Sequence, residues 1–136
     1  LFRSLEHCLQ TATRALRGGA DIDWIISALI HDIGDDLAPL NHDSFAATII
    51  APYVREECRW VIKHHGIFQL KYYGEKIGLN PKESQKFKNH EHFAAAVNFC
   101  EKWDQTSFDP NYNTLPLDYF IPMIVEVFSR EPWTFN

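Results

Sequence analysis

Apolar residues recur along most of the chain at the three- and four-residue spacing of helices. No run alternates apolar and polar residues over any length, so the pattern predicts no strands. Glycine, proline and asparagine interrupt the pattern and mark where helices end. The expected helices cover residues 4–17, Asp21 or Asp23 to Ile33, about 41–52, about 55–65, 70–77, 91–104, and a last helix capped by Asp118. This pattern predicts one all-α domain over residues 1–136.

Several predicted helix ends rest on glycine or proline. Gly18 and Gly19 follow the first helix, Gly34 follows the second and Gly66 follows the fourth. Glycine is common just past a helix end because it tolerates backbone angles that other residues avoid. Pro122 is expected in the first turn of the last helix, where its missing N–H costs no hydrogen bond.

Composition narrows the functional classes. The 136 residues are 46% hydrophobic and contain 13 basic against 18 acidic residues, a net charge of −5 without a basic cluster. Nucleic acid and anionic membranes are therefore not expected as partners. No apolar stretch approaches the roughly 18–20 residues that span a bilayer, and no signal peptide is visible. Three cysteines without metal-type spacing, Cys8, Cys58 and Cys100, indicate reduced core thiols. We expect a cytoplasmic protein. The chain begins without an initiator Met, which leaves room for an N-terminal segment upstream.

The most distinctive polar residues are His31 and Asp32, which stand side by side after the apolar run 24–30. A helix that is apolar on most faces is buried, so these two ionisable side chains need partners. Burying a neutral polar group without one costs about 2–7 kcal/mol, and a charge costs more. A metal ion satisfies both side chains, because imidazole nitrogen and carboxylate oxygen bind first-row metals. A buried hydrogen-bonded pair is the alternative.

Three polar residues on other predicted helices continue the spacing of a buried face: His42, His65 and Asp104. Hydrogen-bonded core histidines are common, but Asp is almost never buried without a partner. One metal centre that gathers all of these residues explains the whole set, and we favour it. His7 differs, because its spacing places it opposite the apolar stripe of the first helix. Periodicity alone leaves His7 in solvent, and it is a ligand only if that side faces a polar cavity.

Four of these residues reproduce the His…His-Asp…Asp pattern of the HD-domain superfamily. His7 stands 24 residues before His31-Asp32, and Asp104 comes late in the chain. The segments Leu5–Gln10 and Leu29–Gly34 also resemble the first two helices of that family. The resemblance extends from about residue 4 to residue 106. It implies a compact helical bundle around a central dimetal site.

Superfamily members that carry two additional histidines hold two metal ions, and this chain has histidines where those are expected. The resemblance implies that Asp32 bridges the ions and is the catalytic carboxylate. It implies six ligands in all, with one ion held by His7, His31, Asp32 and Asp104 and the second by His42 and His65.

Two chemically distinct branches share this ligand set. One contains binuclear HD phosphohydrolases. The other contains mixed-valent diiron oxygenases, including myo-inositol oxygenase and the enzyme that cleaves 2-amino-1-hydroxyethylphosphonate. The sequence around His7 and around Trp103-Asp104 is similar to that of the phosphonate-cleaving enzyme.

Two departures bear on the substrate. Many HD proteins have Lys after His-Asp-x-Gly, whereas this chain has Asp35 followed by Asp36. Acidic residues beside a site disfavour an anionic phosphoester unless a cation compensates. The residues that gate the substrate in the phosphonate-cleaving enzyme lie upstream of its first metal-binding His, beyond the start of this chain. Our candidates for contacting the substrate are His64, Gln69, Lys71, Tyr72 and His90.

The sequence therefore predicts a metal-dependent HD enzyme, with a diiron oxygenase as the favoured function. It would use O₂ to cleave a C–C or C–P bond of a small hydroxylated substrate. Imidazole and carboxylate ligands without thiolate suit Fe, Mn or Zn. The resemblance to the diiron oxygenases makes iron the favoured metal, and Mn, Mg or Zn are the alternatives. The second hypothesis is a binuclear phosphohydrolase acting on a nucleotide or phosphomonoester. The third is an HD scaffold that binds a ligand without turnover. The oligomeric state is left open.

Overall fold

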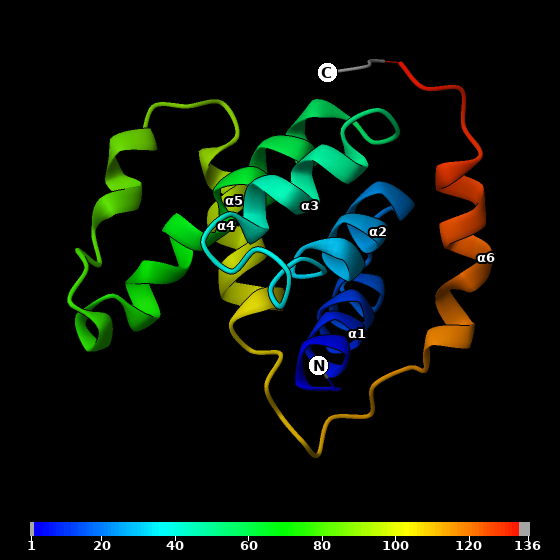
Figure 1. Ribbon diagram of the computed structural model, residues 1–136, viewed down its shortest axis with the longest axis horizontal. Coiled ribbons are helices and arrows are strands. Elements are labelled where there is room, and N and C mark those ends of the chain that lie inside the picture. The colour runs from blue at the N-terminus through cyan, green and yellow to red at the C-terminus, as the bar shows by residue number, and fades with distance from the viewer. Residues whose placement is uncertain (1, 134–136) are drawn as a thin grey trace.

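The computed structural model describes residues 2–133, all of whose regular elements are helical (Figure 1). The α-helices are α1 (Phe2–Arg17), α2 (Ile22–Ile30), α3 (His42–Ile50), α4 (Glu56–Tyr73), α5 (Phe93–Asn98) and α6 (Leu117–Phe128). Two short 3₁₀ segments, η1 (Glu75–Ile77) and η2 (Glu83–Phe87), follow α4, and a π-helical segment, η3 (Phe99–Asp104), continues α5. The prediction of an all-α fold is confirmed.

Two helix pairs form the centre of the molecule. α1 packs on α2 and α3 packs on α4, while η3 closes against α1 and α4. Fully buried side chains at the centre come from four elements and include Ile26, Ile50, Ile62 and Phe99. The segment with η1 and η2 projects on one side of this centre, and α6 stands on the other (Figure 1). The three cysteines are buried free thiols, as predicted.

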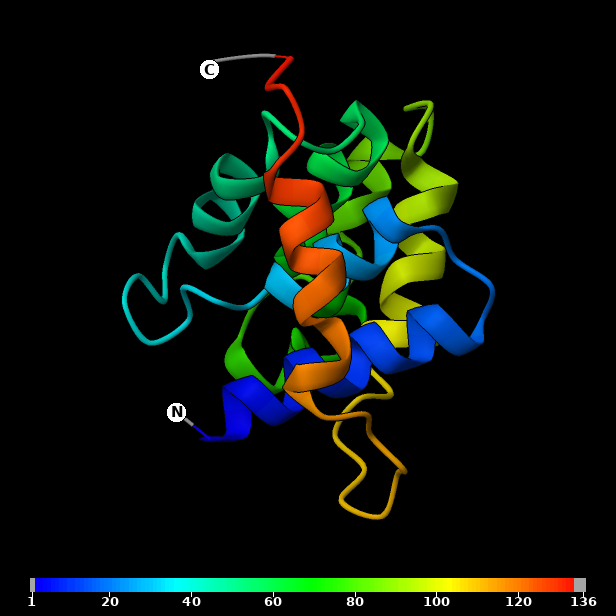
Figure 2. The same ribbon diagram turned by 90° about the vertical axis from the view of Figure 1, so that its right-hand side faces the viewer.

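The C-terminal part of the chain packs across α2. Figure 2 shows α6 crossing in front of the other helices, with Phe120 and Val127 as its fully buried anchors. Beyond it, Arg130 pairs with Asp23 at 2.8 Å, and the Trp133 indole N–H donates to the Val54 carbonyl oxygen at 2.9 Å. These contacts bind the end of the described chain to the α3–α4 junction.

Two expectations for the last helix are wrong. Pro116, not Asp118, precedes its first residue, and Asp118 lies inside the first turn. Pro122 stands in the second turn instead of the first. The position tolerates proline because Pro122 is exposed, so the carbonyl group it leaves without a partner can bond to water.

The fourth helix does not end at Gly66 but continues to Tyr73. A helix-interior glycine costs roughly 1 kcal/mol relative to alanine, so Gly66 requires a reason. A Cβ atom added there would lie 3.0 Å from an Asp43 carboxylate oxygen, because α3 approaches α4 closely at this point. Gly66 is therefore explained by the close packing of α3 and not by the end of a helix. The separate helix expected over 70–77 does not form, because α4 covers its first residues and η1 its last.

Two helices near the polar residues differ from the expected boundaries. α2 is capped as predicted, with the Asp21 carboxylate accepting the Trp24 N–H, but it ends at Ile30 and not at Ile33. The helix expected over 91–104 is instead α5 followed by the π-helical η3. π-helical turns are rare and frequently stand at functional sites. Within residues 2–133, no helix is long and apolar enough to cross a membrane.

We predict that Phe120→Ala lowers the free energy of unfolding by about 3–5 kcal/mol, because it removes a fully buried aromatic side chain. Chemical denaturation monitored by circular dichroism measures the change. Tyr119→Ala, at the exposed neighbouring position, is the control and should cost far less. Equal losses in the two variants would contradict the docking of α6 described above.

Candidate metal centre

One cluster of side chains joins the first two helices to η3. The His7 Nε2 atom lies 2.8 Å from the Asp104 Oδ1 atom and 3.1 Å from the His31 Nε2 atom. Asp32 reaches the same point, with its Oδ2 atom 3.3 Å from His7 Nε2 and 3.4 Å from His31 Nε2. Four donor atoms, two nitrogens and two oxygens, therefore surround one position.

A second cluster uses the other oxygen of the same carboxylate. The Asp32 Oδ1 atom lies 3.2 Å from His42 Nε2 and 3.1 Å from His65 Nε2. The ligand atoms of each cluster all lie within 4.8 Å of one another. Asp32 thus faces two adjacent positions, one through each oxygen.

Hydrogen bonds on the far side of each ring fix the imidazole orientations. The Nδ1 atoms of four histidines face backbone carbonyl oxygens, and a carbonyl can only accept, so each Nδ1 carries the proton. The contacts are His7 to Ser107 at 2.9 Å, His31 to Ala28 at 2.6 Å, His42 to Pro39 at 3.1 Å and His65 to Ile62 at 2.6 Å. In the neutral tautomer each Nε2 atom is therefore without a proton and faces the centre of its cluster, where its lone pair could bind a metal ion.

This donor set fits metal ions. Donors at right angles on an ion with bonds of about 2.1 Å lie roughly 3.0 Å apart, close to the separations observed. The Asp104 Oδ2 atom is buried and has no hydrogen-bond partner, a costly condition that a cation relieves. Among the described residues, Asp32 and Asp104 have only histidines as ion-pair partners.

Electrostatics at the cluster favours positive charge. Burial favours a neutral His7, but the hydrogen bonds that its ring N–H donates to the Asp104 and Asp32 carboxylates prevail and raise the pKa of His7 to about 9. The hydrogen bond to Asp32 raises the pKa of His42 to about 9 as well. Burial opposes ionisation of Asp32 and Asp104, yet the charge of His31 keeps the pKa of both carboxyls well below the usual range. The same carboxylates that attract protons attract a divalent cation.

Comparison with known proteins agrees with this geometry. The family model described as HD domain matches residues 4–91. The chain belongs to the HD domain family. A search of the curated proteins found no match. The matched region of this HD domain contains five of the six clustered side chains. Asp104 lies beyond the matched region, and only the three-dimensional structure shows that it joins the cluster.

Local structure explains how the HD domain brings these residues together. Because α2 ends at Ile30, His31 and Asp32 stand at its end, with His31 fully buried and Asp32 partly exposed. Asp104 is the last residue of the π-helical η3. Phe99, from the start of η3, packs edge-on against the rings of His31 and His65 at centroid distances of 5.5 and 6.4 Å.

His7 is buried, although helix periodicity placed it in solvent. The segment after η3 folds back over this side of α1. The Ser107 carbonyl oxygen accepts the His7 N–H, the Phe108 ring stacks on the imidazole at 4.2 Å, and Gln10 donates to the Asp109 carbonyl oxygen. α1 is consequently covered by other segments on several faces. The single apolar stripe along its sequence does not predict this. The structure thus brings all six predicted ligands together, while their role as ligands stays a prediction.

A cavity of about 260 Å³ opens onto the two His/Asp clusters. Asp32, His42, His65 and Asp104 form one side of it, and the other lining residues are Asp35, Gly66, Gln69, Leu70, Tyr73, Ile77 and Phe108. The Gln69 side-chain oxygen is buried and has no hydrogen-bond partner. Gln69 itself lines the cavity, so its amide group is a candidate for contact with a ligand there.

The other candidates for substrate contact do not line this cavity. The His64 ring lies against the Trp60 ring at 4.3 Å between centroids, and the His90 ring stacks on Trp60 at 4.0 Å. Lys71 and Tyr72 are on α4 but are not among the lining residues. Two aromatic residues that line the cavity, Tyr73 and Phe108, are not among the sequence candidates for contacting the substrate. Tyr73 follows Gly66 and Gln69 at helical spacing once α4 is known to continue, and that continuation was the missing signal.

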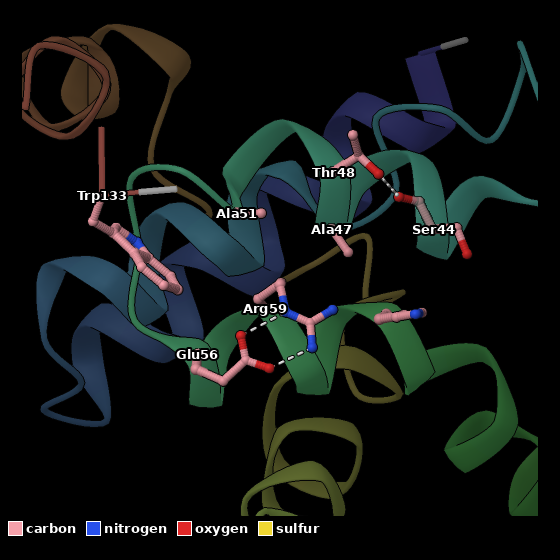
Figure 3. Close-up of a pocket in the computed structure, with 8 residues that line it drawn as sticks. Ser44, Ala47, Thr48, Ala51, Glu56, Arg59 and Trp133 are labelled. Carbon is pink, nitrogen blue, oxygen red and sulfur yellow. Dashed lines mark hydrogen bonds and ion pairs between the residues drawn. The ribbon is translucent and has the colours of Figure 1, made fainter. Parts of the chain in front are cut away.

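A larger cavity, about 540 Å³, lies between α3 and α4 and contains none of the six clustered residues. Figure 3 shows that two of its charged side chains are already paired, with the Arg59 guanidinium bonded to the Glu56 carboxylate. Ser44 and Thr48 bond to each other there through a backbone oxygen. This cavity therefore offers no comparable donor set.

We predict that Asp32→Ala removes nearly all bound metal, because it deprives both positions of a ligand. His31→Ala should do the same at its own position, and His42→Ala should leave about one ion per chain. Elemental analysis after metal loading and desalting measures these contents. His92→Ala, outside both clusters, should retain the full content; equal loss in this control would show that the ligand set is wrong.

Proposed function

We propose that this HD domain is a mixed-valent diiron oxygenase that uses O₂ to cleave a C–C or C–P bond of a small hydroxylated substrate. The observation that carries the proposal is the Asp32 carboxylate, which faces His7 and His31 through one oxygen and His42 and His65 through the other. A carboxylate shared in this way suits two adjacent metal ions. The diiron oxygenases and the binuclear phosphohydrolases of the HD superfamily both require two adjacent ions.

The chain's own residues would bind and orient the reactants. Two iron ions held by the clusters would supply the electrons and open coordination positions that O₂ chemistry requires. Asp32 would hold the two positions at a fixed separation, and the backbone carbonyls behind each imidazole would keep the Nε2 atoms facing the centre. Leu70 and Phe108 give the cavity apolar walls that reduce access of water.

The lining of the cavity favours a substrate group that is not strongly anionic. None of the described residues that line it is Lys or Arg, and Asp35 adds a carboxylate at its edge. A phosphate group would have to rely on the metal ions alone. A hydroxyl group, in contrast, can donate to the unpartnered Gln69 oxygen. On this ground we favour a hydroxylated carbon skeleton, and C–C over C–P cleavage.

A binuclear phosphohydrolase is the second candidate, because two adjacent metal positions also suit in-line attack on a phosphoester. The acidic Asp35 at the cavity weighs against it. A non-catalytic scaffold is the third, and the presence of all six side chains weighs against it. We further propose a cytoplasmic enzyme whose partners are a small molecule and O₂, without nucleic acid or membrane.

Anaerobically purified protein is predicted to contain about two irons per chain and to show a mixed-valence paramagnetic resonance signal, because the donor set is rich in imidazole and carboxylate. Elemental analysis and resonance spectroscopy make the measurement. Mn, Mg or Zn together with hydrolysis of generic phosphoesters would favour the second candidate. Protein that takes up no metal would leave only the scaffold.

We predict that Gln69→Leu raises the KM for a hydroxylated substrate about 5- to 150-fold, as expected for the loss of a buried hydrogen bond worth about 1–3 kcal/mol. Metal content should not change, because Gln69 belongs to neither cluster. Oxygen consumption over a panel of small hydroxylated compounds identifies the substrate and gives the KM. Lys71→Ala, on the same helix but outside the cavity, is the matched control. A rise in KM in that control alone would place the substrate elsewhere.

A further inference from the structure

The 540 Å³ cavity between α3 and α4 offers no metal site, but it has binding chemistry of its own (Figure 3). Its volume lies in the range of pockets that hold small molecules. We call it the hairpin cavity, because α3 and α4 are consecutive helices joined by the short connection 51–55. Its lining residues are Ser44, Ala47, Thr48, Ala51, Glu56, Arg59, Lys63 and Trp133.

The antiparallel course of the two helices sets the order of groups along the hairpin cavity. The end of α3 is joined to the start of α4, whereas the start of α3 reaches the middle of α4. There, the Asp43 carboxylate lies 3.0 Å from the place of a Cβ atom at Gly66. Residues at equal distance from the connection 51–55 are therefore level with each other. The level pairs are Ala51 with Glu56, Thr48 with Arg59, and Ser44 with Lys63.

An aromatic ring stands at one end of the hairpin cavity. Trp133 is 55% exposed, yet two hydrogen bonds hold it in place. Its indole N–H donates to the Val54 carbonyl oxygen at 2.9 Å, and its backbone N–H donates to the Pro52 carbonyl oxygen at 3.0 Å. Figure 3 shows this ring at the Glu56 end, away from Ser44. An exposed and oriented indole binds planar rings by stacking.

A positive charge without a partner stands toward the other end. The Lys63 side chain makes no ion pair or hydrogen bond with another described residue. The Ser44 hydroxyl is level with it and can donate a hydrogen bond. The Asp43 carboxylate is directed at Gly66 and does not line the cavity. A lysine ammonium binds phosphate as a point charge, so this end suits an anionic group.

The middle of the hairpin cavity holds an internally neutral pair. The Arg59 Nε atom donates to the Glu56 carboxylate at 2.6 Å and Nη2 donates to its other oxygen, which leaves Nη1 for a further acceptor. Hydroxyl groups of a ligand can accept from this guanidinium and donate to the carboxylate. Because Glu56 and Lys63 are seven residues apart on α4, the ring end and the anion end are separated by about 10 Å along the helix axis.

We propose that the hairpin cavity binds a nucleoside monophosphate, with its base stacked on Trp133 and its phosphate paired with Lys63. Such a molecule joins a planar ring to an anion through a hydroxylated sugar, which matches the order of groups along the cavity. The lining residues carry two positive charges against one negative charge, so the phosphate is attracted although the whole chain is acidic.

This site is separate from the metal centre, because none of the six clustered residues lines the hairpin cavity. The bound nucleotide is therefore not the substrate of the metal centre, and the proposal does not depend on the oxygenase function. It does contact both helices of the second cluster, since α3 carries His42 and α4 carries His65.

Calorimetric titration of the full chain with adenosine monophosphate, adenosine and ribose phosphate tests each part of the ligand. The nucleotide is expected to bind at one site per chain. Adenosine lacks the phosphate and ribose phosphate lacks the base, so each should bind about tenfold more weakly or worse. Equal affinity for adenosine would overturn the role of Lys63, and equal affinity for ribose phosphate would overturn that of Trp133. No detectable binding of the nucleotide would overturn the proposal outright.

Variants locate the two ends of the nucleotide. Lys63→Gln should weaken binding of the nucleotide about tenfold or more and leave that of adenosine nearly unchanged. Trp133→Ala should weaken both, and Trp133→Phe, which keeps a ring, should weaken both less. Lys71→Gln is the matched control, because Lys71 is exposed on the same helix and does not line the cavity. Equal weakening in Lys71→Gln and Lys63→Gln would show that the phosphate is attracted only by general surface charge, which contradicts the proposal.

The variant Asp32→Ala separates this site from the metal centre. It is expected to bind adenosine monophosphate as tightly as the unaltered chain, because Asp32 does not line the hairpin cavity. Loss of nucleotide binding in Asp32→Ala, together with full binding in Lys63→Gln, would place the nucleotide at the metal centre and overturn the proposal. A chain that takes up no metal yet binds the nucleotide through Lys63 and Trp133 would overturn the oxygenase while supporting the hairpin cavity.

Discussion

The contact on which the whole site depends is the Asp32 carboxylate between four imidazoles. Its two oxygens face different pairs of histidines, so moving this one side chain would disrupt both clusters at once. The surrounding geometry serves that contact. α2 ends before His31, so that His31 and Asp32 stand where the helix stops, and the glycine at 66 allows α3 to approach α4 beside His65. The helix boundaries near the site are therefore part of its chemistry.

Much of the fold and the set of clustered residues could be predicted from the sequence. His42, His65 and Asp104 continue apolar stripes, and a buried ionisable group on such a stripe must have a partner. Periodicity alone cannot place these residues at a common centre, because spacing along a helix says nothing about which neighbour a side chain meets. That step rested on one metal centre explaining the whole set and on the resemblance to HD proteins. His65 and Asp104 are buried, as the pattern indicates, whereas His42 is partly exposed.

The remaining features depend on contacts between distant segments, which local pattern does not encode. His7 is covered by Ser107 and Phe108, about a hundred residues away in the chain. α4 continues through Gly66, where an added Cβ atom would lie 3.0 Å from the Asp43 carboxylate of the neighbouring helix. Gln69 is a sequence candidate as a hydrogen-bond donor to a substrate, whereas its buried oxygen without a partner is evident only in the folded structure. In each case a tertiary contact overrides or supplements the local signal.

Without a bound metal ion, the polar atoms of the two clusters have too few favourable partners among protein groups and water. Four Nε2 atoms and two carboxylates face one another, and one Asp104 oxygen has no partner at all. Such a cluster destabilises the folded state unless protons or cations neutralise it. Because the imidazoles are already oriented by backbone carbonyls, an incoming ion needs little reorganisation, and its binding free energy contributes to the stability of the fold. Hydrophobic packing of α1, α2, α3 and α4 therefore supports the polar centre, and a bound ion would in turn stabilise that packing. Asp32 is the residue through which this coupling passes, since it belongs to both clusters.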